Sequence, residues 1–197
     1  MLYFQFTPFP SISTARLLLR QVTPADATQI LALRSNPNIM RYIPRPLAQN
    51  LADALQHIDL YNTGIAENIN LNWGIAWQNH PDILIGLIGY VRTQPQNHSA
   101  EIGYLLSLEN QNKGVMHEAL NVVIQYGFKT MQLHRIEAVI DPQNTASEKL
   151  LQKNGFVKEG YFKENCYFDG QFLDSVYYTL FRKNYLSDII AVADSVE

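Results

Sequence analysis

A strand, a short polar loop, a long helix and a second strand follow one another in the middle of this chain. The first strand is predicted over Ser99–Leu106, where apolar residues dominate. Apolar residues at helical spacing predict a helix over residues 115–130, and the second strand follows at Arg135–Ile140. Two strands joined by a crossover helix pair in parallel. The run therefore predicts a mixed α/β sheet that contains a parallel pair.

The loop before that helix, Gln111-Asn112-Lys113-Gly114, has the properties of an anion-binding site. The first N–H groups of a helix lack partners within it, and the helix dipole places partial positive charge beside them. Gly114 has no side chain to keep a phosphate away, and Lys113 adds a cation. Ordinary helix starts share these features, so the loop alone leaves both interpretations open. Neither the Walker nor the G-x-G-x-x-G signature occurs in the sequence.

The remaining patterns complete a single α/β fold. We expect one domain over residues 1–197, with its core at residues 14–183 and a C-terminal tail at residues 186–197 that is a short helix or disordered. The sheet is expected to have six to seven strands, mostly antiparallel, flanked by about four helices. Further strands are predicted at residues 14–21, 71–77, 83–93, 156–166 and 172–182, and further helices at residues 24–35, 50–63 and 145–154. Asp169-Gly170, between the last two strands, is a hairpin turn signal.

Composition and charge narrow the class of protein. With 197 residues, of which 47% are apolar, the chain can build a substantial core. A net charge of −3 argues against a general nucleic-acid binder. We expect no membrane span, because no apolar run approaches about 20 residues, and no signal peptide is evident. The single cysteine, Cys166, fits a reducing compartment, and no Cys/His cluster has zinc spacing. The cytoplasm is therefore the expected location, and no metal is expected.

Short motifs occur along the chain in a specific order. They are Thr14-Ala15-Arg16-Leu17-Leu18-Leu19-Arg20, Ala100-Glu101-Ile102-Gly103-Tyr104, Gln111-x-x-Gly114-x-Met116, His134-Arg135-Ile136-Glu137-Ala138, Asp141-Pro142-x-Asn144-x-x-Ser147 and Asn154-Gly155-Phe156. In this order the chain resembles the Gcn5-related N-acetyltransferase (GNAT) superfamily over residues 14–183. More narrowly, it resembles the RimJ/RimL-like branch of ribosomal-protein-alanine N-acetyltransferases.

The resemblance implies a fold and a cofactor site. In it, acetyl-CoA lies where the parallel strands Ser99–Leu106 and Arg135–Ile140 splay apart. Gln111 and Gly114 match the family's acyl-CoA motif, while Met116 stands where that motif has glycine or alanine. The implied pyrophosphate ligands are the backbone N–H groups of Asn112, Lys113, Gly114, Val115 and Met116. Backbone near Leu106 and Leu108, with the Asn144 side chain, is implied to hold the pantetheine arm.

Acetyl transfer needs a neutral amine, a stabilised oxyanion and a stabilised leaving thiolate. Glu101 is the first candidate for the base, since the wider family often places an acidic residue on this strand; the alternative is an ion-paired strand carboxylate. Ser147 matches the serine that is thought to assist the thiolate in this branch, and the alternative is ordinary helix-start chemistry. Some relatives carry a carboxylate where Cys166 stands, and we favour a buried, small apolar role for this cysteine. Glu164, two residues earlier, is expected on the same strand face. Tyr104 is expected to be a core residue rather than a ligand contact.

These observations predict an N-acetyltransferase that moves acetyl from acetyl-CoA to a primary amine, either a protein N-terminus or a small amine. A monomer or a homodimer is expected, without nucleic-acid or membrane partners. The alternative is a non-catalytic acyl-CoA sensor or interaction module on the same fold, which the departures at Met116 and Cys166 would suit.

Overall fold

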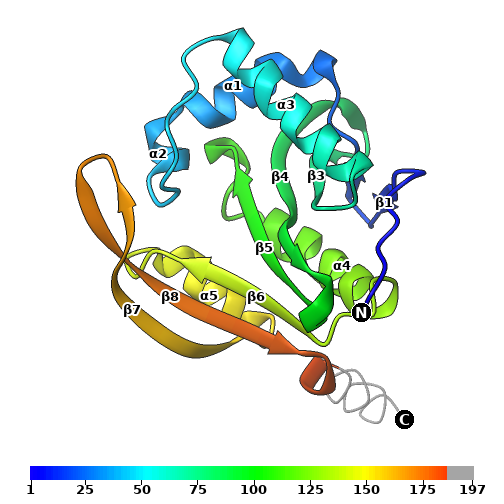
Figure 1. Ribbon diagram of the computed structural model, residues 1–197. Helices are drawn as coiled ribbons and strands as arrows, with labels where there is room; N and C mark the ends of the chain where they lie inside the picture. The colour runs from blue at the N-terminus through cyan, green and yellow to red at the C-terminus, as the bar shows by residue number, and fades with distance from the viewer. Residues whose placement is uncertain (186–197) are drawn as a thin grey trace.

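The computed structural model describes residues 1–185, so the predicted tail at residues 186–197 lies outside the described part of the chain. Eight strands form one sheet in the order β1-β2-β3-β4-β5-β6-β8-β7 (Figure 1). The strands are β1 Ile12–Ser13, β2 Leu17–Arg20, β3 Leu71–Trp77, β4 His80–Gln94, β5 Ser99–Leu106, β6 Arg135–Ile140, β7 Val157–Phe168 and β8 Gln171–Phe181. The α-helices are α1 Ala27–Ser35, α2 Pro37–Met40, α3 Leu51–Ala66, α4 Val115–Lys129 and α5 Thr145–Lys153.

The architecture confirms the predicted fold: the sheet is mostly antiparallel, and β5 and β6 form its one parallel pair among the described residues. It has eight strands, not six or seven, because the two-residue strand β1 at Ile12–Ser13 precedes the strand expected at residues 14–21, where the structure has β2. The Leu17 N–H donates to the Thr14 hydroxyl at 2.8 Å, and this tight turn separates β1 from β2. The additional helix, α2, is a single turn that starts at Pro37 and is capped by the Asn36 side chain.

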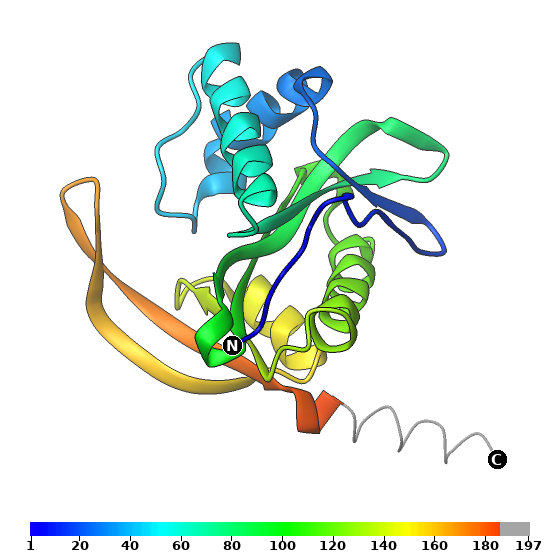
Figure 2. The same ribbon diagram turned by 45° about the vertical axis from the view of Figure 1, so that its right-hand side comes forward.

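The helices cover the two faces of the sheet unequally (Figures 1 and 2). α1, α2 and α3 pack on one face, where Ile30 and Ile58 meet Leu87 of β4. α4 and α5 cover the opposite face, where Leu120 and Leu151 are fully buried. Along β5 the side chains alternate between these two cores, as a strand requires. Below, we call the faces the α1–α3 face and the α4–α5 face.

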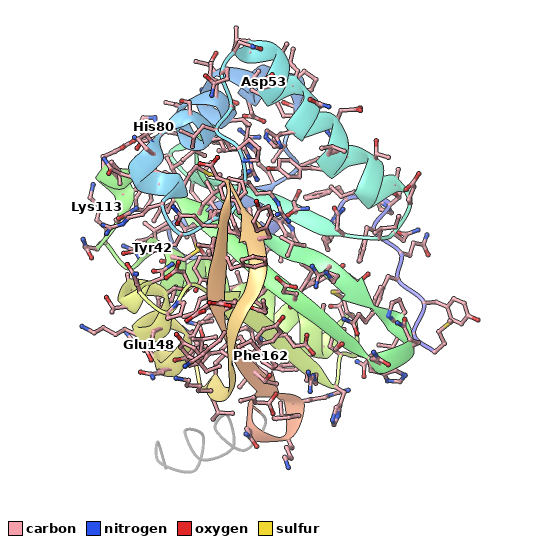
Figure 3. All side chains as sticks on the ribbon, turned by 60° about the vertical axis from the view of Figure 1, so that its left-hand side comes forward. Tyr42, Asp53, His80, Lys113, Glu148 and Phe162 are labelled. Carbon is pink, nitrogen blue, oxygen red and sulfur yellow. The ribbon has the colours of Figure 1, made fainter. Side chains whose placement is uncertain are left out.

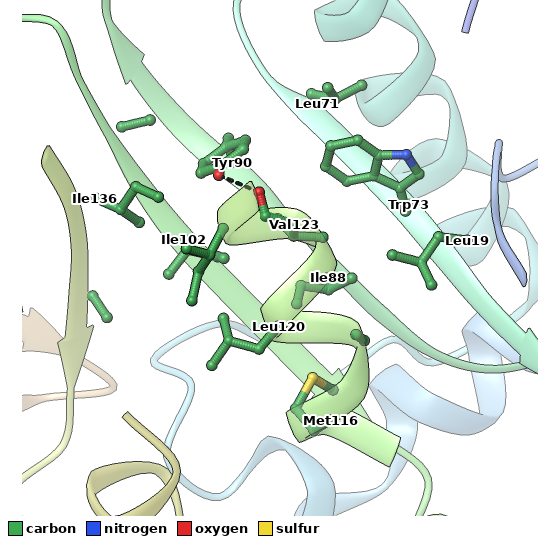
Figure 4. Packing of buried hydrophobic residues seen from close by; sticks show 14 of the residues in the cluster. Leu19, Leu71, Trp73, Ile88, Tyr90, Ile102, Met116, Leu120, Val123 and Ile136 are labelled. Atoms are coloured by element: carbon green, nitrogen blue, oxygen red, sulfur yellow. Dashed lines mark hydrogen bonds between the residues drawn. The ribbon is translucent and has the colours of Figure 1, made fainter. Parts of the chain in front are cut away.

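α4 is fixed against the sheet by close packing and one buried hydrogen bond (Figure 4). The Tyr90 hydroxyl on β4 donates to the Val123 carbonyl of α4 at 2.7 Å, and the Tyr90 side chain is fully buried. Gly127 lies one turn later on the same helix face, where a Cβ atom would come within 2.0 Å of the Tyr90 hydroxyl oxygen. The helix can approach the sheet this closely because residue 127 has no side chain.

β5 and β6 are paired over only part of their length. The parallel register joins Ser99, Ala100 and Glu101 to Arg135, Ile136 and Glu137 and then stops. β5 continues to Leu106 beside β4, while β6 continues to Ile140 beside β8. We call residues 102–106 of β5 and 138–140 of β6 the divergent segment. Polar backbone groups there that face the neighbouring strand have no ladder partner across β5 and β6, so a ligand can pair with them.

A long hairpin, β7 and β8, completes the sheet beyond β6 (Figures 1 and 2). Asp169 and Gly170 form its turn with φ values of 49° and 78°, which confirms the predicted Asp-Gly hairpin signal.

Within residues 1–185, no helix is both long enough and apolar enough to cross a bilayer.

Candidate active site

The loop before α4 is shaped by two residues with left-handed backbone conformations. Asn112 has φ of 58° and Gly114 has φ of 74°, and α4 begins directly afterwards at Val115. The Met116 side chain packs in the core beneath the helix (Figure 4). Because that side chain points into the core, its size does not cover the N–H groups at the helix start. The loop therefore fits an anion, and the departure from the family motif at Met116 is compatible with that role.

A second cation lies over this loop, and the sequence analysis did not single it out. The Arg16 guanidinium donates to the Lys113 carbonyl at 3.1 Å and pairs with Glu118 at 2.7 Å. Glu118 also accepts from the Thr14 hydroxyl at 2.5 Å and from the Arg16 N–H at 3.0 Å. Burial acts to raise the pKa of Glu118, but these hydrogen bonds outweigh it and lower the pKa. Glu118 thus stays ionised and holds Arg16 at this loop. Lys113 of the same loop is exposed (Figure 3).

Gln111 braces the loop against the end of β5. The Ser107 N–H donates to Ile85 of β4 at 2.9 Å, so the polar backbone groups of Leu106 point the other way, toward the divergent segment. The Gln111 amide donates to the Leu106 carbonyl at 3.1 Å. The backbone of Leu106 therefore faces the divergent segment, with its carbonyl already engaged by Gln111.

Leu108 lies farther from this segment, in a short 3₁₀ helix at Leu108–Asn110. A pocket of about 270 Å³ opens beside that turn on the α1–α3 face, between α1 and the start of β4, with Leu33, Ile85 and Leu108 among its lining residues. Neither Glu101 nor Ser147 lines this pocket. The pocket thus lies beside the predicted cofactor-binding residue Leu108 but includes neither of the predicted catalytic residues.

Glu101 lies at the point where β5 and β6 stop pairing, on the α1–α3 face. Its carboxylate contacts Arg92 at 3.2 Å, and 18% of its side-chain surface is exposed. Burial raises the pKa of Glu101, and the nearby Glu137 carboxylate raises it further, against the opposing effect of Arg92 and Arg45. A carboxyl group whose pKa is raised is a stronger base once it is deprotonated.

Two further carboxylates, those of Glu137 and Glu159, lie on the same face as Glu101. The sequence analysis did not predict either of them as a site residue. Glu137 is the register partner of Glu101 and accepts from the Arg135 Nε at 2.6 Å. Glu159 accepts from the Thr179 hydroxyl at 2.7 Å and lies 3.8 Å from Arg135. The predicted parallel pairing could have identified Glu137, because residues at equal positions on two parallel strands point to the same face of the sheet.

Ser147 lies on the opposite side of the divergent segment, in the first turn of α5 on the α4–α5 face. Its hydroxyl is 2.6 Å from the Tyr104 hydroxyl of β5. Its N–H donates to the side-chain oxygen of Asn144, the N-cap of α5, at 3.1 Å. The side-chain oxygen of Asn144 therefore caps the helix, and its side-chain NH₂ group can donate to a ligand. Tyr104 was predicted to be a core residue, but its hydroxyl belongs to this polar group.

The structure corrects the predicted placement of Glu164. It was expected on the same strand face as Cys166, but β7 contains a register shift between Phe162 and Cys166 that breaks the alternation. Glu164 adopts φ of 53° in this irregular stretch, and its N–H donates to Asp174 at 2.8 Å. Glu164 is exposed, while Cys166 is half-buried against the β8 strand, which is less burial than the predicted apolar role requires.

The predicted residues thus form two groups, one on each side of the divergent segment. Glu101 approaches it from the α1–α3 face, and Ser147 approaches it from the α4–α5 face with the positive end of α5. This arrangement suits a reaction in which a base and a leaving group act on opposite sides of one carbon atom. Among the described residues, no group of three or more His, Cys, Asp or Glu side chains is placed to hold a metal ion.

Comparison with known proteins agrees with this fold. The family model for an acetyltransferase (GNAT) domain matches residues 16–157. The uncharacterized N-acetyltransferase YoaA of Bacillus subtilis is 35% identical over 172 residues, which are 87% of this chain and 97% of that protein. The ribosomal protein uS5-alanine N-acetyltransferase of Escherichia coli is 43% identical over 79 residues, 40% of this chain and 41% of that protein.

A solved structure is similar over nearly the full length. The spermidine N-acetyltransferase from Vibrio cholerae, in complex with CoA and spermine, has a TM-score of 0.76 and 27% identity, and the match covers 88% of this chain and 99% of that chain. This chain therefore belongs to the GNAT acetyltransferase family, which confirms the resemblance of its motifs and the acetyl-CoA-dependent N-acyltransferase activity that the resemblance implies.

Proposed function

We propose that this chain transfers acetyl from acetyl-CoA to a primary amine at the divergent segment, with Glu101 as the base and Ser147 as the group that stabilises the departing thiolate. The observation that carries the proposal is their placement on opposite faces of the same segment, next to the loop before α4. In this account the N–H groups of residues 112–116, with Lys113 and Arg16, hold the pyrophosphate. The backbone of Leu106 and the Asn144 amide orient the pantetheine arm.

The transfer itself is a direct displacement. The amine attacks the thioester carbon, the electron pair of the C=O π bond moves to the oxygen, and Glu101 takes the proton that the nitrogen loses. The C=O bond then re-forms as the carbon–sulfur bond breaks, and the sulfur keeps the electron pair of the broken bond. The Ser147 hydroxyl and the N-terminus of α5 stabilise the thiolate, which takes its proton from solvent after release.

The charges on the acceptor side favour an acceptor whose amine is its one cation, and we infer the N-terminal amine of a peptide. Glu101 already contacts Arg92, and Glu137 and Glu159 both contact Arg135. A polyamine gains most from carboxylates that have no cation beside them. The relative from Escherichia coli is named for an alanine of ribosomal protein uS5 as its acceptor, which supports this inference. Comparing an alanine-terminated peptide with spermidine at equal concentration tests it, since faster turnover of spermidine would contradict it.

Thermal unfolding with acetyl-CoA tests the cofactor site. At a hundredfold excess over Kd, binding should stabilise the fold by about 2.7 kcal/mol. For a chain of this size, that corresponds to a Tm rise of roughly 5–10 °C. ATP and NAD at the same concentration are the controls and should produce a smaller rise. No rise with acetyl-CoA over a wide concentration range would contradict the proposed site.

Glu137→Gln is expected to move the acid limb of the kcat/KM profile to lower pH. Glu137 raises the pKa of Glu101, so removing its charge lowers that pKa. The freed Arg135 acts in the same direction. A base with a lower pKa stays deprotonated at lower pH, while the plateau rate should remain within about threefold of wild type. Glu67→Gln removes an equal charge at the exposed end of α3 and is the control. A limb that shifts equally in both variants would refute this coupling.

We also propose a cytoplasmic location, which the lone Cys166 and the requirement for acetyl-CoA support. A RimJ/RimL-like position within the family fits the same motifs. The alternative of a sensor without turnover rested partly on Met116. The departure at Met116 no longer supports that alternative, because the Met116 side chain is buried in the core.

A further inference from the structure

Tyr104 spans the divergent segment at the place where acetyl transfer is proposed. It lies on β5 beyond Glu101, the last residue paired with β6. Its ring packs against the core on the α4–α5 face, and its hydroxyl reaches across to the Ser147 hydroxyl of α5 at 2.6 Å. This hydrogen bond therefore joins one strand of the divergent pair to the helix that follows the other strand.

The contact restricts the orientation of a buried hydroxyl. Only 6% of the Ser147 surface is exposed, and its N–H is already used by Asn144. A serine hydroxyl carries one hydrogen and two acceptor lone pairs, and it rotates freely unless a partner fixes it. In the first turn of a helix, a serine side chain can also turn back to the backbone. A partner on β5 prevents that and orients the Ser147 oxygen toward the strand.

The chemistry of the pair favours donation from Tyr104 to Ser147, because a phenol is a stronger acid than a serine hydroxyl and therefore the stronger hydrogen-bond donor. Burial raises the pKa of Tyr104 to about 12, so the phenol keeps its proton throughout the neutral range. When Tyr104 donates to the Ser147 oxygen, the single hydrogen of Ser147 is left for another acceptor. A developing thiolate in the divergent segment is such an acceptor, and charged acceptors bind hydrogen-bond donors most strongly.

We propose that Tyr104 is a positioning residue for acetyl transfer: its hydroxyl donates to Ser147 and so directs the Ser147 hydrogen at the departing sulfur. This inference rests on the proposed function. As the carbon–sulfur bond breaks, the sulfur takes the electron pair and accepts a hydrogen bond from Ser147. Neither hydroxyl gives up its proton, so Tyr104 and Ser147 leave the step unchanged.

A second tyrosine provides a matched control for a purely structural role. The Tyr178 hydroxyl of β8 donates to the Glu148 carboxylate at 2.6 Å, one residue after Ser147 on the same helix. Both tyrosines therefore anchor the first turns of α5 to the sheet, but only Tyr104 contacts the serine. If Tyr104 serves merely to hold α5 in place, losing either hydroxyl should affect catalysis alike.

The experiment compares four variants: Tyr104→Phe, Ser147→Ala, the double variant and Tyr178→Phe. Y104F should lower kcat about tenfold and leave KM for acetyl-CoA unchanged, since one hydrogen bond to the transition state is weakened. S147A should lower kcat more, and the double variant should equal S147A, because Tyr104 acts only through the serine. Y178F should keep the wild-type kcat. Tm values of all four proteins show whether any loss reflects destabilisation.

Three results would overturn the inference while the enzyme remains active: a wild-type kcat in Y104F, independent losses that multiply in the double variant, or an equal loss in Y178F. Absence of amine-dependent CoA release from the wild-type protein would refute the proposed function instead. The two failures are thus distinguishable, because the first set requires an active wild-type enzyme.

Discussion

Glu101→Gln should lower kcat by about 10²-fold or more, since a glutamine cannot accept the proton that the attacking amine loses. The acid limb of the kcat/KM profile, which reports deprotonation of this carboxyl group, should disappear in the variant. The raised pKa of Glu101 places that limb at higher pH than an ordinary glutamate would. The Kd for acetyl-CoA should stay near the wild-type value, because Glu101 lies on the face away from Ser147. Stopped-flow measurement of thiol release gives the rates.

The matched control is Glu164→Gln, which removes the same charge from the other carboxylate considered as a base. Glu164 is exposed on the irregular part of β7, and its substitution should leave kcat within about twofold of wild type. An unchanged rate in E101Q with an intact fold would remove the assignment of Glu101. A large loss in E164Q would instead identify Glu164 as the base and require β7 to move toward the divergent segment.

Gly127→Ala should destabilise the protein by about 3 kcal/mol, because it overpacks the buried contact between α4 and β4. The new Cβ would lie 2.0 Å from the Tyr90 hydroxyl oxygen and 3.1 Å from Ile136, and neither neighbour reaches solvent. For a chain of this length, the loss corresponds to a Tm lower by roughly 6–12 °C. Since α4 carries the loop at Gly114, acetyl-CoA should also bind more weakly.

A second substitution tests the cause. Tyr90→Phe alone should cost about 1 kcal/mol, from the lost hydrogen bond to Val123. It also removes the atom that the new Cβ meets first, so Y90F/G127A should be less destabilised than the sum of the two single variants. Additive losses would contradict the steric explanation and would attribute the Gly127 effect to the helix itself.

The fold was predictable where local patterns agree with the tertiary structure. The periodicity of residues 115–130 and the Asp-Gly turn each predicted one element, and α4 and the β7–β8 hairpin match them. The short strand β1 was not predictable, because it pairs with β2 over only two residues and the turn at Thr14 between them depends on a side-chain hydrogen bond, with no glycine or proline to mark it. The prediction that Glu164 shares a strand face with Cys166 was wrong for a similar reason, because it assumed a strand without bulges.

For the candidate site, the sequence predicted individual residues better than the contacts between them. Ser147 and Glu101 were identified from motifs, but Tyr104 was interpreted as a core residue because an aromatic ring on a strand usually packs inward. Its ring does pack inward, and only its hydroxyl reaches Ser147. Arg16 was missed because its partners, Lys113 and Glu118, lie about a hundred positions away in the sequence. Such contacts follow from strand order rather than from spacing.

The measurement that tests the central claim most directly is release of CoA thiol from acetyl-CoA by the purified chain, with and without amines. The panel contains an alanine-terminated peptide, spermidine and a tertiary amine that cannot form a stable amide. The account predicts thiol release above the no-amine background with a primary amine, in step with the acetylated product seen by mass spectrometry, and none above background with the tertiary amine. Acetyl-CoA that binds but is consumed no faster with any primary amine would contradict the account.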